Sequence, residues 1–259
     1  MTWIELDLDK SIEENAEVYF EEAKKMKKKS EGAKKAIENF KKKLEELEKK
    51  DKAFKEKNSY SRKERKRKWY EKYHWFISSE DFLVIAGRDS TTNEILIKKH
   101  TEKDDVVLHT DMSGSPFTVV KAEGKKPSEK TLQEAADFTV SFSNAWKKGI
   151  ASLEVFYVSP DQVTKEPSSG EYLPKGAFVI RGKVEYLLGR LNLAIGLLQD
   201  GQAMIGPLSA VEKHCKSAIK VFPGKSKTSE VAKKIQAKFK YDDLDEIIRL
   251  LPSGGVDLK

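Results

Sequence analysis

The most regular pattern of apolar positions lies in residues 11–57, where spacings of four and three residues alternate. A period of 3.5 residues, with Lys and Glu at most other positions, is typical of a coiled-coil helix. Ser11 and Glu14 fit a capping box at its start. We predict one helix over residues 11–57, about 70 Å long. Its seam consists of Ile12, Ala16, Tyr19, Ala23, Met26, Ser30, Ala33, Ile37, Phe40, Leu44, Leu47, Asp51 and Phe54.

A shorter, basic helix is predicted over residues 61–73, because Ser61 and Glu64 form a second capping box. The two helices would make a coiled-coil hairpin in a first domain, residues 1–73. The second helix is long enough to cover only about 20 Å of the first. Most of the seam therefore needs another partner, which is either a second copy of this chain or a different protein.

Residues 62–76, RKERKRKWYEKYHWF, join a basic run to an aromatic run. Trp69 and Tyr73 lie four residues apart on one face of the predicted helix. They are either platforms on which bases stack or, as we favour, core packing where the helix meets a sheet. The basic residues form either an electrostatic contact beside an RNA surface or a solvated helix end. The candidates for RNA contact in this run are Arg65, Lys66, Arg67 and Lys68.

From about Trp75 the pattern changes to short runs rich in Val, Ile and aromatic residues, bounded by Gly, Asp, Asn and Pro. Such runs are typical of strands. One helix with a buried stripe interrupts them, starting at Ser128 behind Pro127. We predict an α+β domain over residues 74–190, with a mainly antiparallel sheet and a packed helix, and expect residues 69–190 to fold without the coiled coil. The strand candidates are FLVIAG, EILIKK, VVLHT, FTVVKA, SLEVFYV and AFVIRG.

Residues 191–259 are predicted to form a small α/β tail. A hairpin in NLAIGLLQDGQAMIGP and a strand in SAIKVFPG precede two helices. The first helix spans about residues 229–240, and the second is capped by Asp242 and runs to Leu251. Residues 213–240 contain nine lysines and one acidic residue, Glu230. This part of the chain is a basic extension.

The chain has 259 residues and a net charge of +7, with 35 % charged and 38 % hydrophobic residues. A moderately basic chain favours a polyanionic partner, although the Lys- and Glu-rich surface of a heat-adapted protein has the same composition. A single cysteine, Cys215, excludes an internal disulfide. We find no apolar run near 18 residues and no signal-peptide core at the start. We therefore expect a soluble, cytoplasmic protein with no membrane partner.

Motifs for catalysis or cofactor binding are weak. The sequence PGKSKTS resembles a phosphate-binding loop, but Ile219 stands where that motif needs its first glycine. None of the four histidines has metal-ligand spacing. Cys215 beside His214 is more often an inert thiol than a nucleophile, and His109 with Asp111 is either a polar brace, which we favour, or an acid–base pair. We predict no enzyme, no catalytic residue, no metal, no cofactor and no small-molecule substrate.

Several segments in order resemble the RNA-binding domain of the NFACT family, the ribosome-quality-control family that includes eukaryotic NEMF and bacterial RqcH. The likeness begins in WYEKYHWFISSEDFLVIAGRDSTTNEI and continues in HTDMSGSPFTVVK and TLQEAADFTVSFSNAW. It ends in QVTKEPSSGEYLPKGAFVIRGK, so that it covers about residues 69–183, nearly half of the chain. The long helix resembles the coiled coil of the family, and the tail resembles archaeal members.

The resemblance implies an RNA-binding module that works on tRNA or on the large ribosomal subunit during quality control of stalled nascent chains. His109 would then hydrogen-bond a base or ribose. The cations at family-matched positions, which would contact phosphate, are Arg88, Lys165, Arg181 and Lys183. The large NFACT-N domain of the family is not recognised in this sequence. The alternative function is a coiled-coil scaffold for protein–protein assembly, whose basic charge is incidental.

Overall fold

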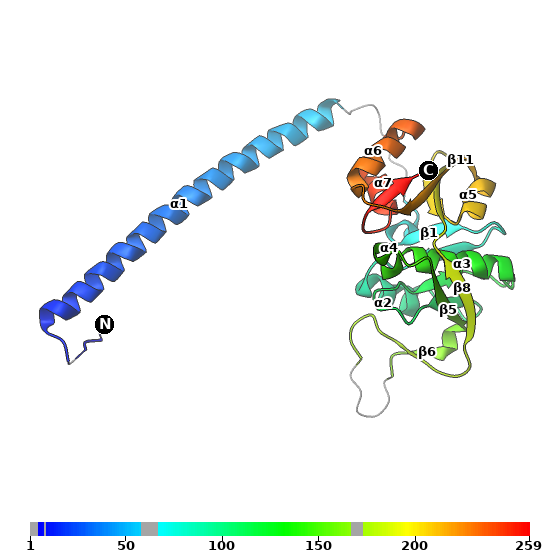
Figure 1. The fold of residues 1–259 in the computed structure, drawn as a ribbon, viewed down its shortest axis with the longest axis horizontal. Helices are drawn as coiled ribbons and strands as arrows, with labels where there is room; N and C mark the ends of the chain where they lie inside the picture. The colour runs from blue at the N-terminus through cyan, green and yellow to red at the C-terminus, as the bar shows by residue number, and fades with distance from the viewer. Residues whose placement is uncertain (1–4, 8, 58–66, 167–172) are drawn as a thin grey trace. The chain divides into compact units, whose positions relative to one another are not determined.

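The structure, a computed structural model, describes residues 5–7, 9–57, 67–166 and 173–259. The chain divides between Lys66 and Arg67 into two units. The first contains one long helix, and the second contains all the strands (Figure 1). Among the described residues, no helix is long and apolar enough to cross a membrane.

The first unit is built on α1, Ile12–Lys57, a single helix of 46 residues. The predicted capping box is present, because the Ser11 N–H donates to Glu14 Oε2 at 2.7 Å and the Glu14 N–H donates to Ser11 Oγ at 3.1 Å. Asn15 strengthens this start, since its Nδ2 donates to the carbonyls of Asp7 and Lys10. The long helix and its beginning are thus confirmed.

The apolar seam of α1 is exposed. Phe40 keeps 69 % of its accessible surface, Met26 keeps 68 % and Leu47 keeps 63 %. Lys24 and Lys42 make ion pairs with Glu21 and Glu38 on the helix surface. Such pairs add only about 0.3–0.5 kcal/mol each, so they do not replace the packing that stabilises most helices in proteins. Within the described part of its own unit, the seam has no apolar cover.

The second unit begins without the predicted helix. Lys68 is extended, with φ −71° and ψ 150°, and a 3₁₀ turn, η1, Trp69–Lys72, follows. The prediction of a helix up to Tyr73 is therefore wrong in its described part, and residues 58–66 lie outside the described residues. In a 3₁₀ turn, side chains three residues apart lie on the same side. The turn thus buries Tyr70 and Tyr73 together and lets the first strand begin at once.

A six-stranded antiparallel sheet forms the centre of this unit, in the order β1-β2-β4-β3-β5-β8. The helix α3, Glu129–Ser141, packs against it, and Ser128 caps this helix by accepting a hydrogen bond from the Lys130 N–H. The antiparallel α+β domain is confirmed. The strands of this sheet are β1 His74–Ile77, β2 Leu83–Ala86, β3 Val106–His109, β4 Thr118–Val120, β5 Ser152–Val158 and β8 Glu185–Arg190.

One predicted strand is a helix. EILIKK lies in α2, Ser90–Lys99, which starts where Asp89 Oδ1 accepts a hydrogen bond from the Thr92 N–H at 2.7 Å. Asn93 and Leu96, three residues apart, are its buried residues, which is helical spacing. Three consecutive apolar residues, 95–97, are typical of a strand, but the Asp89 N-cap starts a helix that includes them.

Shorter elements complete this region. Residues 144–148 form α4, Asn144–Lys148, and η2 is Pro160–Gln162. The predicted strand AFVIRG is reduced to β7, Val179–Ile180, which pairs with β6, Val163–Thr164, in a separate two-stranded sheet.

The C-terminal residues form a second antiparallel sheet, in the order β10-β9-β11-β12. The predicted hairpin and strand are β9 Leu193–Leu198, β10 Ala203–Gly206 and β11 Cys215–Pro223. The predicted helices are α6, Thr228–Phe239, and α7, Leu244–Leu250. The cap of α7 is Asp243, whose Oδ1 accepts from the Glu246 N–H, and not Asp242. The helix α5, Leu208–His214, and the strand β12, Val256–Leu258, were not predicted from the sequence.

The two sheets share one hydrophobic core. A methyl group on Gly206 of β10 would lie 2.8 Å from Phe76 Cβ, so the strand approaches β1 as closely as a glycine allows. Farther away, the indole Nε1 of Trp146 donates to the carbonyl of Gly255 at 3.0 Å. Residues 191–259 are therefore packed into the same unit as residues 74–190.

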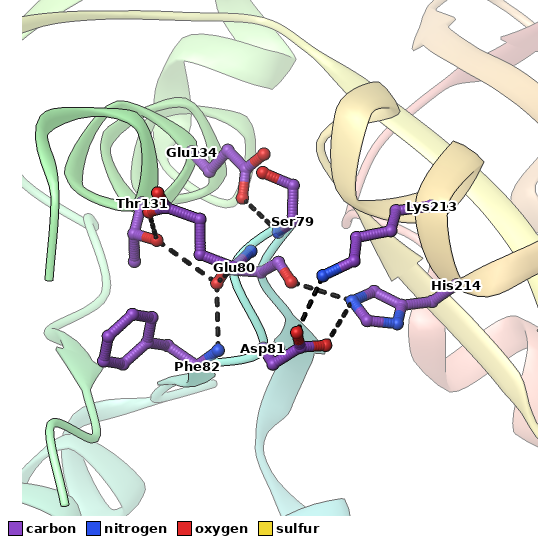
Figure 2. A network of polar contacts seen from close by, with 9 residues as sticks. Ser79, Glu80, Asp81, Phe82, Thr131, Glu134, Lys213 and His214 are labelled. Carbon is purple, nitrogen blue, oxygen red and sulfur yellow. Dashed lines mark hydrogen bonds and ion pairs between the residues drawn. The ribbon is translucent and has the colours of Figure 1, made fainter. Parts of the chain in front are cut away.

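The turn between β1 and β2 shows how this joining works in detail (Figure 2). On one side, Glu134 of α3 accepts a hydrogen bond from the Ser79 N–H at 2.8 Å. On the other side, Lys213 of α5 makes a 2.7 Å ion pair with Asp81, and His214 Nε2 donates to the Ser78 carbonyl at 2.8 Å. The turn is thus bonded on one side to α3, which packs against the central sheet, and on the other side to α5 of the C-terminal part.

We expect a fragment of residues 67–259 to unfold cooperatively, at a temperature close to that of the full chain. Residues 67–190 should not, contrary to the prediction from the sequence for residues 69–190, because the two sheets share one core. Removing β9, β10 and α5 exposes Phe76 and its neighbours, and each large apolar side chain loses about 1.5–3 kcal/mol of burial free energy. Thermal denaturation followed by circular dichroism compares the fragments. A sharp transition in residues 67–190 would show that the C-terminal part is dispensable.

Candidate nucleic-acid interface

A cleft of about 1080 Å³ opens in the second unit. It lies where the loop after β2 meets the end of β3 at His109 and the β3–β4 loop, residues 110–117. The segment 175–180 and the end of α7 with residues 251–253 form further walls. Two of the predicted RNA-binding residues, Arg88 and His109, line it.

Three rings form a row along one wall of the cleft. His109, Phe156 and Tyr186 are direct partners in the register of β3, β5 and β8. Neighbouring rings meet edge to face, with centroids 5.9 Å and 6.5 Å apart. Phe156 is buried, whereas Tyr186, on the edge strand, is 54 % exposed. Directly opposed residues of an antiparallel pair project from the same face of a sheet, so the row follows from strand pairing.

His109 is held in one orientation. Its ring stacks on Phe117, with centroids 4.0 Å apart and planes 9° apart, and its Nδ1 donates to the Pro116 carbonyl at 2.9 Å. Burial lowers the pKa of His109, so the ring is neutral at neutral pH. With the proton on Nδ1, Nε2 is a hydrogen-bond acceptor. The polar brace that the sequence suggested is present, but its partner is Pro116 rather than Asp111.

Arg88 connects three segments. Its Nη1 donates to the Arg249 carbonyl at 2.9 Å, and its Nη2 donates to the Tyr73 carbonyl at 3.2 Å. Nε is buried and has no partner among the described residues. The guanidinium thus ties the start of β1 and the end of α7 to the loop after β2. Its predicted contact with phosphate stays a prediction, and two of its three nitrogens are already used.

Lys165 is also engaged within the protein. Its Nζ lies 3.2 Å from Glu94 Oε2 and 5.0 Å from the centre of the Phe178 ring. The hydrogen bonds from Lys98 and Lys165 hold the pKa of Glu94 at about 2. Lys165 therefore neutralises a carboxylate and packs on an aromatic ring. Its ammonium group is already paired within the protein, which weakens its case as a phosphate contact.

Arg181 and Lys183 differ from Lys165. Arg181 Nη2 lies 3.7 Å from the carboxylate of the exposed Glu166 and donates to the carbonyl of the same residue at 3.3 Å. Lys183 is exposed and makes no ion pair with any residue that the structure describes. Gln162 fixes their backbone, because its Nε2 donates to both carbonyls at 2.9 Å and 2.8 Å. Both side chains are exposed and stand on a fixed backbone, and the partner of Arg181, Glu166, is itself exposed.

The basic run before β1 is only partly described. Arg65 and Lys66 lie outside the described residues, while Arg67 and Lys68 are exposed. Neither Arg67 nor Lys68 lines the cleft. The contact of this run with RNA stays a prediction.

The aromatic residues after this run belong mainly to the core. Tyr70, Tyr73, Trp75 and Phe76 are buried, which confirms the packing interpretation for Tyr73 but not for Trp69. Trp69 is 45 % exposed and stacks on His100 with centroids 4.4 Å apart.

Among the residues that line the cleft, Phe156, Tyr186, Lys175 and Arg249 were not predicted from the sequence as site residues. Phe156 was assigned to a strand, but no local pattern in the sequence tells which residues of β3 and β8 lie beside it. The row is visible only when the register of the three strands is known.

Glycine is required where the walls of the cleft approach one another. Gly176 has φ +81°, and a side chain there would meet the backbone of Ser90 at 2.6 Å. Gly114 also has φ +81°, and a methyl group would meet Asn144 Nδ2 at 2.3 Å. Both positions favour glycine for its left-handed backbone and for its lack of Cβ.

Other titratable groups give little sign of catalysis. Burial raises the pKa of Cys215 to about 11, so the thiol stays protonated, as expected of an inert cysteine. His214 directs Nε2 at the Ser78 carbonyl. No cluster of three His, Cys, Asp or Glu residues suited to a metal is found among the described residues.

Comparison with known proteins assigns this region. Residues 72–182 match the family model of the NFACT protein RNA binding domain. The chain belongs to the NFACT family. The archaeal Rqc2 homolog aRqcH of Methanocaldococcus jannaschii is 44 % identical over 200 residues, which are 75 % of this chain and 30 % of that protein. This relative supports the archaeal type that the sequence suggested.

Eukaryotic relatives match a smaller part. The ribosome quality control complex subunit NEMF of Homo sapiens is 40 % identical over 126 residues, 48 % of this chain and 12 % of that protein. The NEMF homolog of Drosophila melanogaster is 38 % identical over 138 residues, 52 % of this chain and 14 % of that protein. The chain thus spans less than a third of the length of these NFACT relatives.

His74, which also lines the cleft, makes stability depend on pH. Its ring stacks on Phe142, and burial lowers its pKa well below the usual range, with a further effect of the Arg88 charge. The unfolded chain takes up a proton near pH 6.5 and the folded chain does not. The stability associated with neutral His74 is complete above about pH 6.5 and is lost as the pH falls. His100 and His109 act in the same direction.

We expect His74→Phe to weaken the pH dependence of the melting temperature between about pH 5 and 7. Removing this group takes away up to about 1.4 kcal/mol of stability change per pH unit. Phe142→Leu is the matched control, since it disturbs the same ring stack without removing a titrating group. Equal pH dependence in His74→Phe and the parent would show that His74 titrates normally in the folded protein.

Proposed function

We propose that this chain binds RNA in ribosome quality control, with tRNA or ribosomal RNA of the large subunit as its target. The match of residues 72–182 to the NFACT protein RNA binding domain is the observation that carries the proposal. The relatives support the cellular setting, because their names place NEMF in the ribosome quality control complex. The role is binding, without a catalytic step.

Phosphate contacts come from exposed cations that are unpaired or, like Arg181, paired only with an exposed carboxylate and its backbone. Arg181 and Lys183 stand in the segment matched to the family and just beyond it. A second group of exposed lysines belongs to the C-terminal part, on β11, α6 and the adjoining segments. Its members, which make no ion pair within the described part of the chain, are Lys216, Lys220, Lys225, Lys227, Lys233, Lys234, Lys238 and Lys240. This group supplies general attraction to polyanions.

Replacing Arg181 and Lys183 with Ala is expected to remove about two phosphate contacts. The slope of log affinity against log salt should fall by roughly 1.5 units, at about 0.7 per contact for single strands. Lys233 and Lys234, replaced together, should instead weaken binding to all RNAs alike. Fluorescence anisotropy with labelled tRNA and ribosomal RNA fragments, over a salt series, measures both effects.

The matched control for charge is the pair Lys27→Ala and Lys28→Ala on α1, where two exposed lysines lie in the other unit. This variant also removes two positive charges, and its slope of log affinity against log salt should equal that of the parent. If the Arg181 and Lys183 variant also keeps the parental slope, the phosphate site is elsewhere. If the parent binds no RNA at physiological salt, the chain is better described as a coiled-coil scaffold.

We also propose that α1 pairs with another helix, from a second copy of this chain or from a different protein. Ile37, Phe40 and Leu44 remain more than half exposed. Covering each would contribute up to about 1.5–3 kcal/mol.

Light scattering at micromolar concentration should show more than a monomer. Phe40→Ser with Leu44→Ser should return the protein to a monomer, while Lys41→Ser with Glu45→Ser, off the seam, should not. A parent that stays monomeric at all concentrations would argue against self-pairing.

A further inference from the structure

We propose that the cleft binds one unpaired, unstacked nucleotide of RNA, with its base on the ring row of His109, Phe156 and Tyr186. This inference rests on the proposed RNA binding and adds that the RNA must contain an unpaired nucleotide. The ring row lies on one face of three neighbouring strands. Two strand spacings separate its ends, about 10 Å. A base laid on Tyr186 therefore brings its edge towards His109.

Tyr186 is the exposed end of the ring row. It keeps 54 % of its surface, while its neighbour Phe156 keeps 7 %. Phe156 supports the tyrosine ring edge to face at 6.5 Å, which fixes the platform without covering it. An exposed ring on a rigid strand, beside a cavity, is what base stacking requires.

His109 gives the other end of the ring row its polarity. Its Nδ1–H is committed to Pro116, so the neutral ring offers Nε2 as an acceptor. No hydrogen bond to Nε2 is found among the described residues. Base amino groups, imino groups and the ribose 2′-hydroxyl all carry a proton that Nε2 can accept. The carboxylate of Asp111, exposed on the same loop, is a second acceptor lining the cleft.

Charge and size favour a single nucleotide over a duplex. The cleft is lined by three cations, Arg88, Lys175 and Arg249, and by two carboxylates, Asp89 and Asp111, so its balance is only +1 (3 − 2). Its volume of about 1080 Å³ is that of a pocket for a small organic ligand. Lys175 and Arg249 are enough to neutralise the phosphate of one unstacked nucleotide. Stacking of its base on the ring row supplies the remaining binding free energy.

A proline-rich peptide is the other class of ligand that grooves lined with aromatic rings accept. Proline has no N–H to donate, so such a segment would leave Nε2 of His109 without a partner unless other residues supplied one. A nucleotide of RNA meets both requirements, because its base stacks on the rings and its base or ribose donates a hydrogen bond to Nε2 of His109.

The experiment uses the full chain and a short RNA duplex carrying one bulged adenine. The comparison duplex has the same backbone with an abasic nucleotide in the bulge, so both offer equal numbers of phosphates. We expect the bulged adenine to bind about 5- to 150-fold tighter than the abasic bulge. The two duplexes should share one slope of log affinity against log salt, because only phosphate contacts set that slope.

Tyr186→Ala should erase the difference between the two duplexes, and Tyr186→Phe should keep it. Phe222→Ala is the matched control, since Phe222 is a 40 % exposed aromatic residue of β11 that does not line the cleft. Because Tyr186 is exposed, its replacement should leave the melting temperature within a few degrees of the parent.

Equal affinity of the parent for the two duplexes, with salt-dependent binding to both, would overturn the nucleotide site and leave RNA binding intact. A preference for the adenine that persists in Tyr186→Ala would move the site away from the ring row. Failure to bind either duplex, tRNA or ribosomal RNA at low salt would overturn the proposed function itself. A polyproline peptide that binds in a Tyr186-dependent way, with no preference between the duplexes, would assign the cleft to protein recognition.

Discussion

The contact between β1 and β10 is the constraint on which the second unit depends. Phe76 fills the space that a side chain on Gly206 would need, and Met204 Sδ accepts a hydrogen bond from the Ile77 N–H at 3.4 Å. This contact brings the C-terminal sheet against the edge strand of the central sheet. It also places α7 where Arg88 can reach the Arg249 carbonyl. One wall of the cleft therefore comes from outside the segment matched to the family model.

The fold uses its cations for two different purposes. Arg88, Lys165 and the buried Lys121, which pairs with Asp105, hold segments together. Arg181 and Lys183 remain exposed on a backbone that Gln162 fixes, and only Arg181 has a carboxylate near it, that of the exposed Glu166. A buried cation that loses its partner carries a large desolvation penalty, so the first group is constrained by stability. The net charge of +7 therefore indicates attraction to polyanions without showing which cations take part.

Local features were predictable from the sequence, and pairings between distant segments were not. The capping box at Ser11, the helix after Ser128 and the hairpin at β9 and β10 each depend on residues close together in the chain. His109 was found through its motif, but its partners in the ring row depend on the register of β3, β5 and β8. Arg88 was predicted from its family-matched position to contact phosphate. Its internal acceptors, the carbonyls of Tyr73 and Arg249, leave no trace in side-chain patterns.

The protonation state of His109 separates affinity from recognition in this interface. Burial keeps the ring neutral, so it adds no charge to attract phosphate at neutral pH. The same burial fixes the tautomer through Pro116 and leaves an acceptor whose direction is set by the stack on Phe117. Long-range attraction must then come from exposed lysines and arginines, which salt weakens. In the proposed nucleotide site, short-range discrimination comes from the rings and one acceptor, which salt affects little, so the two contributions should change independently in variants.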